Sequence, residues 1–383
     1  MRVCNQLCVF IAIAVNIGIF GGNHASAATP YFGRAILVGM DLTFGSVVTV
    51  DSFDSSDPNA SDNGEYSPTL AKDTAIVAIA TARPLNIGNA KVAGYVSTVN
   101  SSLTLGPGGS VGDRSWLTAG TNGIQPGHHL TNSPIYRPQV QLPFTNGLSP
   151  LVNGTITTTN GVEAYSYLFD SGDYAVDVLS GKIFVRGQAR VLVRTAINVS
   201  GNGKIEILEG ASLIIYCAGE SVDLSGYGVI NRTKRASNFQ YFGVGYSEIR
   251  IAGSGMIGCI YAPDAALSIW GGGGSVNSSF IGSFVSNSLY VNGRASFHYD
   301  EALGKFGPTW EYPILHLAIT TQGTNGLLRV IGPPGTSYTL QSTTDTSATN
   351  WHDFWSSRIS AAGFEEFPIF LSFPTRFFRT MHP

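Results

Sequence analysis

Four aspartates lie close together near the N-terminus, and their side chains have the chemistry to hold a cation. They are Asp51, Asp54, Asp57 and Asp62, with Asn59 between them and Asn63 directly after the last. Carboxylate and amide oxygens in a glycine-bearing loop are the ligands that calcium prefers. The spacing differs from the helix-loop-helix calcium loop, in which ligands recur at every second residue and a glutamate closes the site. The sequence therefore predicts either a weak calcium site or a plain turn in which these side chains bond their own backbone.

A second polar cluster, near residue 300, contains His298, Asp300 and Glu301 within the run Phe297-His298-Tyr299-Asp300-Glu301. In a strand, His298 and Asp300 project from one face and Glu301 from the other. A His-x-Asp pair can bind a metal or act as an acid–base pair, but a transition metal needs a third ligand nearby. The favoured interpretation is a cap, in which the three side chains bond the end of a strand ladder and protect its edge.

A glycosidase or polysaccharide lyase would need two carboxylates about 5–10 Å apart. The available carboxylates that could face one groove are Asp170, Asp173, Asp177, Asp223 and Asp264. We find no serine-nucleophile elbow, phosphate loop or paired-cysteine metal motif, and we assign no catalytic or cofactor-binding residue. The adjacent His128 and His129 point in opposite directions in an extended chain, so one metal would rarely bind both.

The element that would position these groups is a repeat of five residues. An apolar residue, a variable residue and a second apolar residue are followed by a spacer and a glycine. Its five copies are Ile197–Gly201, Val222–Gly226, Ile249–Gly253, Leu267–Gly271 and Leu289–Gly293. A strand-and-turn unit that recurs about every 18 to 27 residues is typical of a solenoid. A second match, 45 residues apart, aligns Ile215–Gly226 with Ile260–Gly271. Neighbouring strands that stack their apolar residues would explain both patterns.

We therefore predict an all-β protein with a right-handed parallel β-helix over residues 35–303. Several Asn-Gly pairs keep an antiparallel sandwich open as the alternative. The proline-rich segment 123–150 fits regular ladders poorly and is predicted to be a surface excursion. After a linker at 304–313, residues 314–383 read as a small β-sandwich-like module. Cys217 and Cys259 are predicted to be two strands apart, too far for a disulfide, and buried as free thiols.

Residues 1–27 have the features of a secretory signal peptide. Arg2 supplies a positive charge, Cys8–Phe20 is mostly apolar, and Ala25-Ser26-Ala27 is a small-residue cleavage signal. Only 12% of residues are charged and the net charge is −3, so nucleic-acid binding is not expected. The basic run Arg232, Lys234 and Arg235 is short enough to be a solvated loop. We predict an exported protein, periplasmic, on the outer surface or extracellular, with no transmembrane segment after cleavage.

The runs Ile260–Leu267 and Phe297–Glu301 resemble an uncharacterised bacterial surface domain that occurs alone or behind PilX-type pilus assembly proteins. The segment Val50–Asn59 is similar to exported proteins of the Verrucomicrobia and related phyla. The tail, Tyr338–Ser342 through Trp351 to Arg376–Arg379, resembles a C-terminal module of secreted proteins in those bacteria. The resemblance implies an exported, β-helix-like surface protein without an established activity.

Together these observations predict a non-catalytic structural or adhesive protein of a bacterial cell envelope. Polysaccharide or other envelope components are the expected partners, and self-association through the ends of the sheet is an open alternative. No cofactor is expected, apart from calcium at the aspartate-rich segment. A carbohydrate-active enzyme, a polysaccharide lyase or glycosidase on the same scaffold, is the alternative function.

Overall fold

The structure is a computed structural model, and it describes residues 10–12, 19–20, 29–131, 135, 137–159, 161–253, 255–271, 278–306, 309–310, 316–322, 325–331, 337–343, 351–360, 364–370 and 377–381. The chain forms two compact units. One comprises residues 30–309, and the other combines residues 1–29 with 310–383. Each unit is described by itself.

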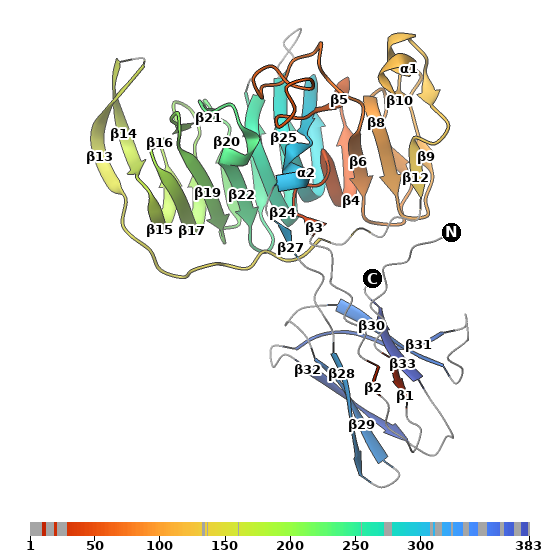
Figure 1. Cartoon of the computed structure of the whole chain (residues 1–383). Coiled ribbons are helices and arrows are strands. Elements are labelled where there is room, and N and C mark those ends of the chain that lie inside the picture. Colours follow the sequence, from red (N-terminus) through yellow and green to blue (C-terminus); the bar gives the residue numbers. More distant parts are fainter. Residues whose placement is uncertain are drawn as a thin grey trace. The chain divides into compact units, whose positions relative to one another are not determined.

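Almost all regular structure in residues 30–309 is β (Figure 1). Six parallel strands close into a ring: β4 (Ile36–Phe44), β6 (Ala75–Ile79), β8 (Lys91–Thr98), β5 (Val48–Phe53), β26 (Ala295–Asp300) and β25 (Ser278–Asn292). Further parallel strands extend this sheet: β24 (Gly255–Trp270), β23 (Glu248–Ala252), β22 (Phe239–Gly243), β20 (Ser221–Leu224), β19 (Ser212–Cys217), β17 (Gln188–Asn198) and β15 (Gly172–Ser180). At its other end lie β10 (Ser110–Gly112), β11 (Gly123–Ile124) and β12 (His129–Thr131).

A second sheet of the same unit contains β13 (Leu151–Thr158), β14 (Gly161–Phe169), β16 (Lys182–Val185), β18 (Lys204–Ile207) and β21 (Val229–Asn231). β13 and β14 are antiparallel, and the other pairs are parallel. The short strands β7 (Leu85–Asn86) and β9 (Leu103–Thr104) pair with each other. Among the described residues, helix is confined to α1 (Arg114–Thr118), α2 (Ala302–Phe306) and the 3₁₀ turn η1 (Ala236–Asn238). The predicted all-β class is confirmed.

The five copies of the repeat are parallel neighbours in register. Ile197 pairs with Val222, Val222 with Ile249, Ile249 with Leu267, and Leu267 with Leu289. All five side chains are at most 2% exposed. Because side chains alternate along a strand, the residue between the two apolar positions faces away from this core. The repeat therefore builds one buried apolar row and leaves an outer face whose residue types vary.

The prediction of a right-handed parallel β-helix over residues 35–303 is wrong. The fifth copy does not end the ladder, because Leu289 also pairs with Leu42 of β4. The long strand β25 changes partner along its length: Ser278–Ile281 pair with β26, and Phe284–Val291 pair with β4. This change of partner joins the N-terminal strands to the late ones and closes a six-stranded parallel barrel, to which the other strands are added.

The proline-rich segment 123–150 is regular at its start, where β11 and β12 pair with β10 and β8. From residue 137 the chain crosses several strands of the unit before β13 begins (Figure 1). Arg137 attaches this crossing segment by donating to the carbonyl oxygens of Pro263 and Ser286, at 2.6 and 3.0 Å. These acceptors stand where β24 and β25 shift register, and the bulge leaves their carbonyl groups open to a side-chain donor.

The other unit is antiparallel. One sheet contains β1 (Phe10–Ala12), β2 (Ile19–Phe20), β33 (Phe377–Met381), β30 (Ser337–Thr343) and β31 (His352–Arg358), and another contains β28 (His316–Gln322), β29 (Asn325–Ile331) and β32 (Phe364–Phe370). Side chains of both sheets form one apolar cluster that includes Leu328, Val330, Tyr338, Leu340 and Phe378. The strands β3 (Thr29–Pro30) and β27 (Thr309–Trp310) complete the chain. Most of residues 1–27 lie outside the described residues, so removal of this segment as a signal peptide stays a prediction.

Candidate functional site

The two polar clusters singled out in the sequence lie beside each other. β26 pairs with β5, and the register places His298 opposite Asp51 and Asp300 opposite Phe53. β26 is therefore an interior strand between β25 and β5, and the ladder does not end there. The side chains of His298, Asp300 and Glu301 connect β26 to the segment 51–74, and we call this set of contacts the joint. The predicted cap places these three side chains at an open end of the ladder instead.

The first part of the joint is centred on the side chain of Asp51. Its Oδ1 lies 2.6 Å from Nδ1 of His298, and its Oδ2 accepts a hydrogen bond from the Tyr66 hydroxyl at 2.7 Å. The Tyr66 ring stacks on the His298 ring with centroids 3.7 Å apart. Burial, followed by the neighbouring Asp51 carboxylate, raises the pKa of Tyr66. Asp51 thus orients a histidine and a tyrosine that are fixed face to face.

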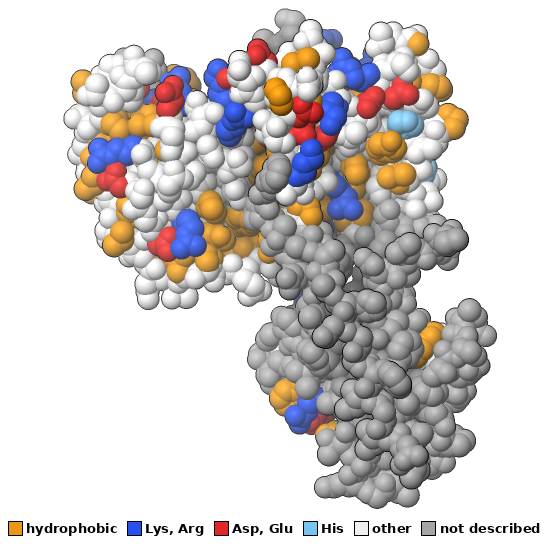
Figure 2. Space-filling view, in the orientation of Figure 1, with side chains coloured by type: hydrophobic (Ala, Val, Ile, Leu, Met, Phe, Trp, Pro, Cys, Tyr) orange, Lys and Arg blue, Asp and Glu red, His pale blue; other side chains and the backbone are white. Residues whose placement is uncertain are grey.

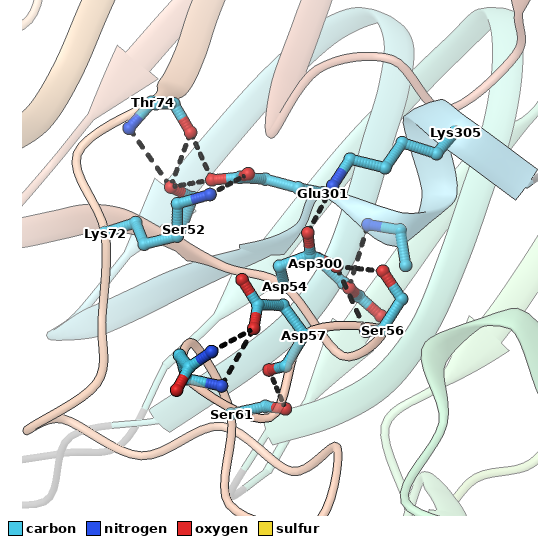
Figure 3. A network of polar contacts seen from close by, with 12 residues as sticks. Ser52, Asp54, Ser56, Asp57, Ser61, Lys72, Thr74, Asp300, Glu301 and Lys305 are labelled. Atoms are coloured by element: carbon cyan, nitrogen blue, oxygen red, sulfur yellow. Dashed lines mark hydrogen bonds and ion pairs between the residues drawn. The ribbon is translucent and has the colours of Figure 1, made fainter.

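The second part of the joint is centred on Asp54 (Figure 3). Asp54 is 1% exposed. Lys305 donates to its Oδ2, and Ser56 donates to Oδ1 from its backbone N–H at 3.0 Å and its hydroxyl at 2.5 Å. Burial by itself raises the pKa of Asp54, but the donors from Lys305 and Ser56 outweigh it and lower that pKa overall. Asp54 is therefore a buried carboxylate held in its ionised form.

Asp300 lies next to Asp54 and is 4% exposed. Its Oδ1 accepts from the backbone N–H groups of Ser55 and Ala302, at 3.0 and 3.1 Å. Burial raises the pKa of Asp300, these N–H donors oppose the shift, and the Asp54 charge adds to it. The pKa values of two adjacent carboxyl groups are thus shifted in opposite directions, because Asp54 has a cationic partner and Asp300 has only neutral donors.

Glu301 points to the other side of β26 and bonds Lys72, Thr74 and the Ser52 hydroxyl (Figure 3). Lys72, Lys305 and Tyr66 were not identified from the sequence, since they lie 15 to 251 residues from the groups that they bind. The basic run 232–235 was also misjudged. Arg235 donates to the carbonyl oxygens of Ser55, Asn63 and Gly64, and Lys234 pairs with Glu65 at 3.0 Å. This run therefore anchors the aspartate-rich loop instead of being merely solvated.

The remaining aspartates of that loop bond locally. Asp57 Oδ1 accepts from the backbone N–H of Asn59 at 2.8 Å, and Asp62 Oδ1 accepts from the side chain of Asn63 at 3.1 Å. The Asn59 N–H bond to Asp57 and the Ser56 N–H bond to Asp54 are Asx-turn bonds of the kind that the turn alternative describes, whereas the Asp62–Asn63 bond joins two side chains. No group of three His, Cys, Asp or Glu side chains suited to a metal ion is found in the described parts of the chain.

The carboxylates considered for glycoside hydrolysis are separated into individual pairs. Asp170, Asp173 and Asp177 bond Arg186, Arg190 and Arg194, respectively. Asp223 accepts from the Ser225 N–H at 2.8 Å, and Asp264 accepts from the Gln139 side chain at 3.1 Å. His128 bonds the Gly94 carbonyl and His129 bonds the Thr98 hydroxyl. Each group considered in the sequence thus has a partner within the protein.

Cys217 and Cys259 are buried and free. Burial raises the pKa of both thiols, which lowers their reactivity. Within the described residues, no helix is both long and apolar enough to cross a membrane.

The outer face of the repeat strands holds a feature that the sequence reasoning missed. Trp270 and Tyr290 are 40% and 41% exposed, and both occupy outward positions of repeat copies. The sequence held a signal for this feature: Tyr290 stands between the two apolar positions of its copy, and Trp270 is the spacer of its copy. Figure 2 shows one face of the molecule, on which charged side chains form small separate groups among larger uncharged areas.

Comparison with known proteins gives one match. A family model described as a domain of unknown function (DUF7305) matches residues 141–306. The matched range includes the runs Ile260–Leu267 and Phe297–Glu301, so the resemblance to an uncharacterised domain is confirmed at that level. Searches of curated proteins and of solved structures found no match. The chain is thus similar to an uncharacterised domain over residues 141–306.

Proposed function

We propose that this chain is an exported, non-catalytic structural or adhesive protein of a bacterial cell surface, with a domain related to those found alone or behind PilX-type pilus assembly proteins. The observation that supports the proposal is the use of the carboxylates. Asp51, Asp54, Asp300 and Glu301 all bond groups from distant parts of the chain. A general acid or nucleophile must instead face the substrate.

The charged side chains of this joint have a mechanical role in the proposal. They connect β26 and α2 to β5 and the segment that follows it, at a sequence separation of up to 251 residues. A surface protein is exposed to proteases and shear, and cross-connections between distant segments oppose local opening of the sheet. The low share of charged residues, 12%, leaves a surface dominated by uncharged polar groups.

The test combines location and turnover. Protease shaving and antibody labelling of intact cells should detect the chain on the outer surface, with a cytoplasmic protein as the negative control. The purified chain should release neither reducing ends nor unsaturated products from a panel of polysaccharides. Turnover that is lost in Asp51→Asn or Asp300→Asn would establish a carbohydrate-active enzyme and overturn the proposal, as would retention of the chain in the cytoplasm.

A further inference from the structure

Arg250, Trp270 and Tyr290 form a cluster on the outer face of three neighbouring repeat strands, β23, β24 and β25. The intervening side chains Ile251, Ile269 and Val291 are buried, so strand alternation directs the cluster to solvent. The two rings meet edge to face with centroids 6.3 Å apart, and the Arg250 guanidinium lies 5.5 Å from the Trp270 ring centroid. The rings are thus held in place before any ligand arrives.

A hollow of about 410 Å³ lies beside this cluster. Tyr290 pairs with Thr43 of the adjacent strand β4, and Thr43 lines the hollow together with Asp41, Arg83 and Asn86. The Tyr290 hydroxyl extends toward β4, since it lies 3.7 Å from the position that a Cβ on Gly45 would take. The path from Trp270 over Tyr290 into the hollow crosses two strand spacings, about 10 Å.

The chemistry of this path fits sugar rings. A pyranose presents a face of C–H groups that packs on an aromatic ring, and its hydroxyls bond carboxylate, amide and guanidinium groups at the edge. The charges beside the path are balanced. Arg83 lies 3.4 Å from Asp41, and Arg250 lies opposite Asp223 on the neighbouring strand β20. A balanced site has no field that would attract a strongly charged polymer.

We propose that the surface formed by Arg250, Trp270, Tyr290 and the adjoining hollow binds a neutral polysaccharide. The sugar rings stack on Trp270 and Tyr290, and the chain crosses β24 and β25 so that its next unit enters the hollow on β4. This inference rests on the proposed role as a surface protein and assigns it a partner and a site. A second copy of the chain is the other occupant that a flat exposed strand face could take.

The test measures binding of the full purified chain to four soluble polymers by affinity electrophoresis and calorimetry. The neutral probes are hydroxyethylcellulose, mannan and galactan, and polygalacturonate is the acidic probe. We expect at least one neutral polymer to bind, with little dependence on salt. Trp270→Ala and Tyr290→Ala should each weaken binding about tenfold or more, as truncation of a central aromatic contact does. Trp270→Phe should retain most of the affinity.

Tyr246→Ala is the matched control, because Tyr246 is a tyrosine more exposed than Tyr290, 58% against 41%, and lies outside the cluster, before the start of β23. It should leave binding unchanged, and circular dichroism should show that all variants fold. Binding of no neutral polymer, or binding that Trp270→Ala does not weaken, would overturn the inference. So would a preference for polygalacturonate, or a dimer in sedimentation that Trp270→Ala dissociates. Surface location and absence of turnover are measured separately, so the proposed function can survive the failure of this site.

Discussion

Two groups of ionised side chains in the same unit differ in what surrounds them. On β15 and β17 and just before these strands, Asp170, Asp173 and Asp177 face Arg186, Arg190 and Arg194 in an exposed ladder, with Asp side chains 39–78% exposed. In the joint between β5 and β26, the Asp54 side chain is 2% exposed beside its lysine partner. Exposed pairs contribute little because water screens them, whereas a buried carboxylate depends on its partner. Equal numbers of ion pairs therefore do not imply equal contributions to stability.

The largest expected effect is that of Asp54→Asn. The amide can still accept from Ser56, but Lys305 loses its anionic partner, and we expect a decrease of about 2 kcal/mol in the free energy of unfolding. Denaturant unfolding followed by circular dichroism, with hydrogen exchange of the β5 and β26 amides, measures this change. Because the pKa of Asp54 is lowered in the fold, its contribution is present above the unfolded pKa and disappears as the pH falls through the folded one. A variant as stable as the parent would show that the joint is no stronger than the ladder.

Asp300→Asn should act in the opposite direction. The amide oxygen can accept the same two N–H bonds, and the substitution removes a charge that burial disfavours. We expect about 1 kcal/mol more stability at neutral pH. Because the pKa of Asp300 is raised, the contribution of Asp300 to stability is fully present below its unfolded pKa and is lost as the pH rises through its folded pKa. Unfolding measured between pH 4 and 7 should therefore show a weaker pH dependence in the variant, and an unchanged profile would contradict this reading of Asp300.

Asp173→Asn tests the ladder. Asp173 pairs with Arg190 across neighbouring strands, but both side chains are solvated, so we expect the denaturant midpoint of the variant to be close to that of the parent. Asp170→Asn is the matched control within the same ladder and should behave alike. A loss as large as that of Asp54→Asn would remove the distinction between the two regions.

The smallest expected effect is the dependence on salt. Raising KCl from 0.05 to 1 M should weaken the Asp173–Arg190 coupling measured by a double-mutant cycle, because salt screens charges that are exposed to water. The Asp54–Lys305 coupling should change less, because Asp54 is shielded from solvent ions. Equal salt dependence of the two couplings would show that ions reach Asp54.

The sequence predicted the parts of this fold that repeat. The repeat copies and the 45-residue match indicated which residues stack, and Ile215, Tyr241 and Ile260 indeed follow one another across three strands. The closure through β4 and β5 was missed, since those strands have no copy of the repeat to reveal their partners. The joint was missed for the same reason: Asp51 and His298 were each noticed, but nothing in the local sequence links them across 247 residues. Lys72 and Lys305 reach Glu301 and Asp54 only because the barrel closes, so the local sequence could not reveal these contacts.

The pairing of the first strands with the last ones determines when this unit can be completed. Thr49 on β5 bonds Ser296 on β26, and these residues are 247 positions apart. A chain made at about 5–20 residues per second needs roughly 12–50 s to span that interval. Throughout this time β4 and β5 have no access to their partners on β25 and β26, and contacts of such long range form slowly. The barrel therefore cannot close before β25 and β26 have been made, and until then β4 and β5 can pair only with the strands that follow them closely in the sequence.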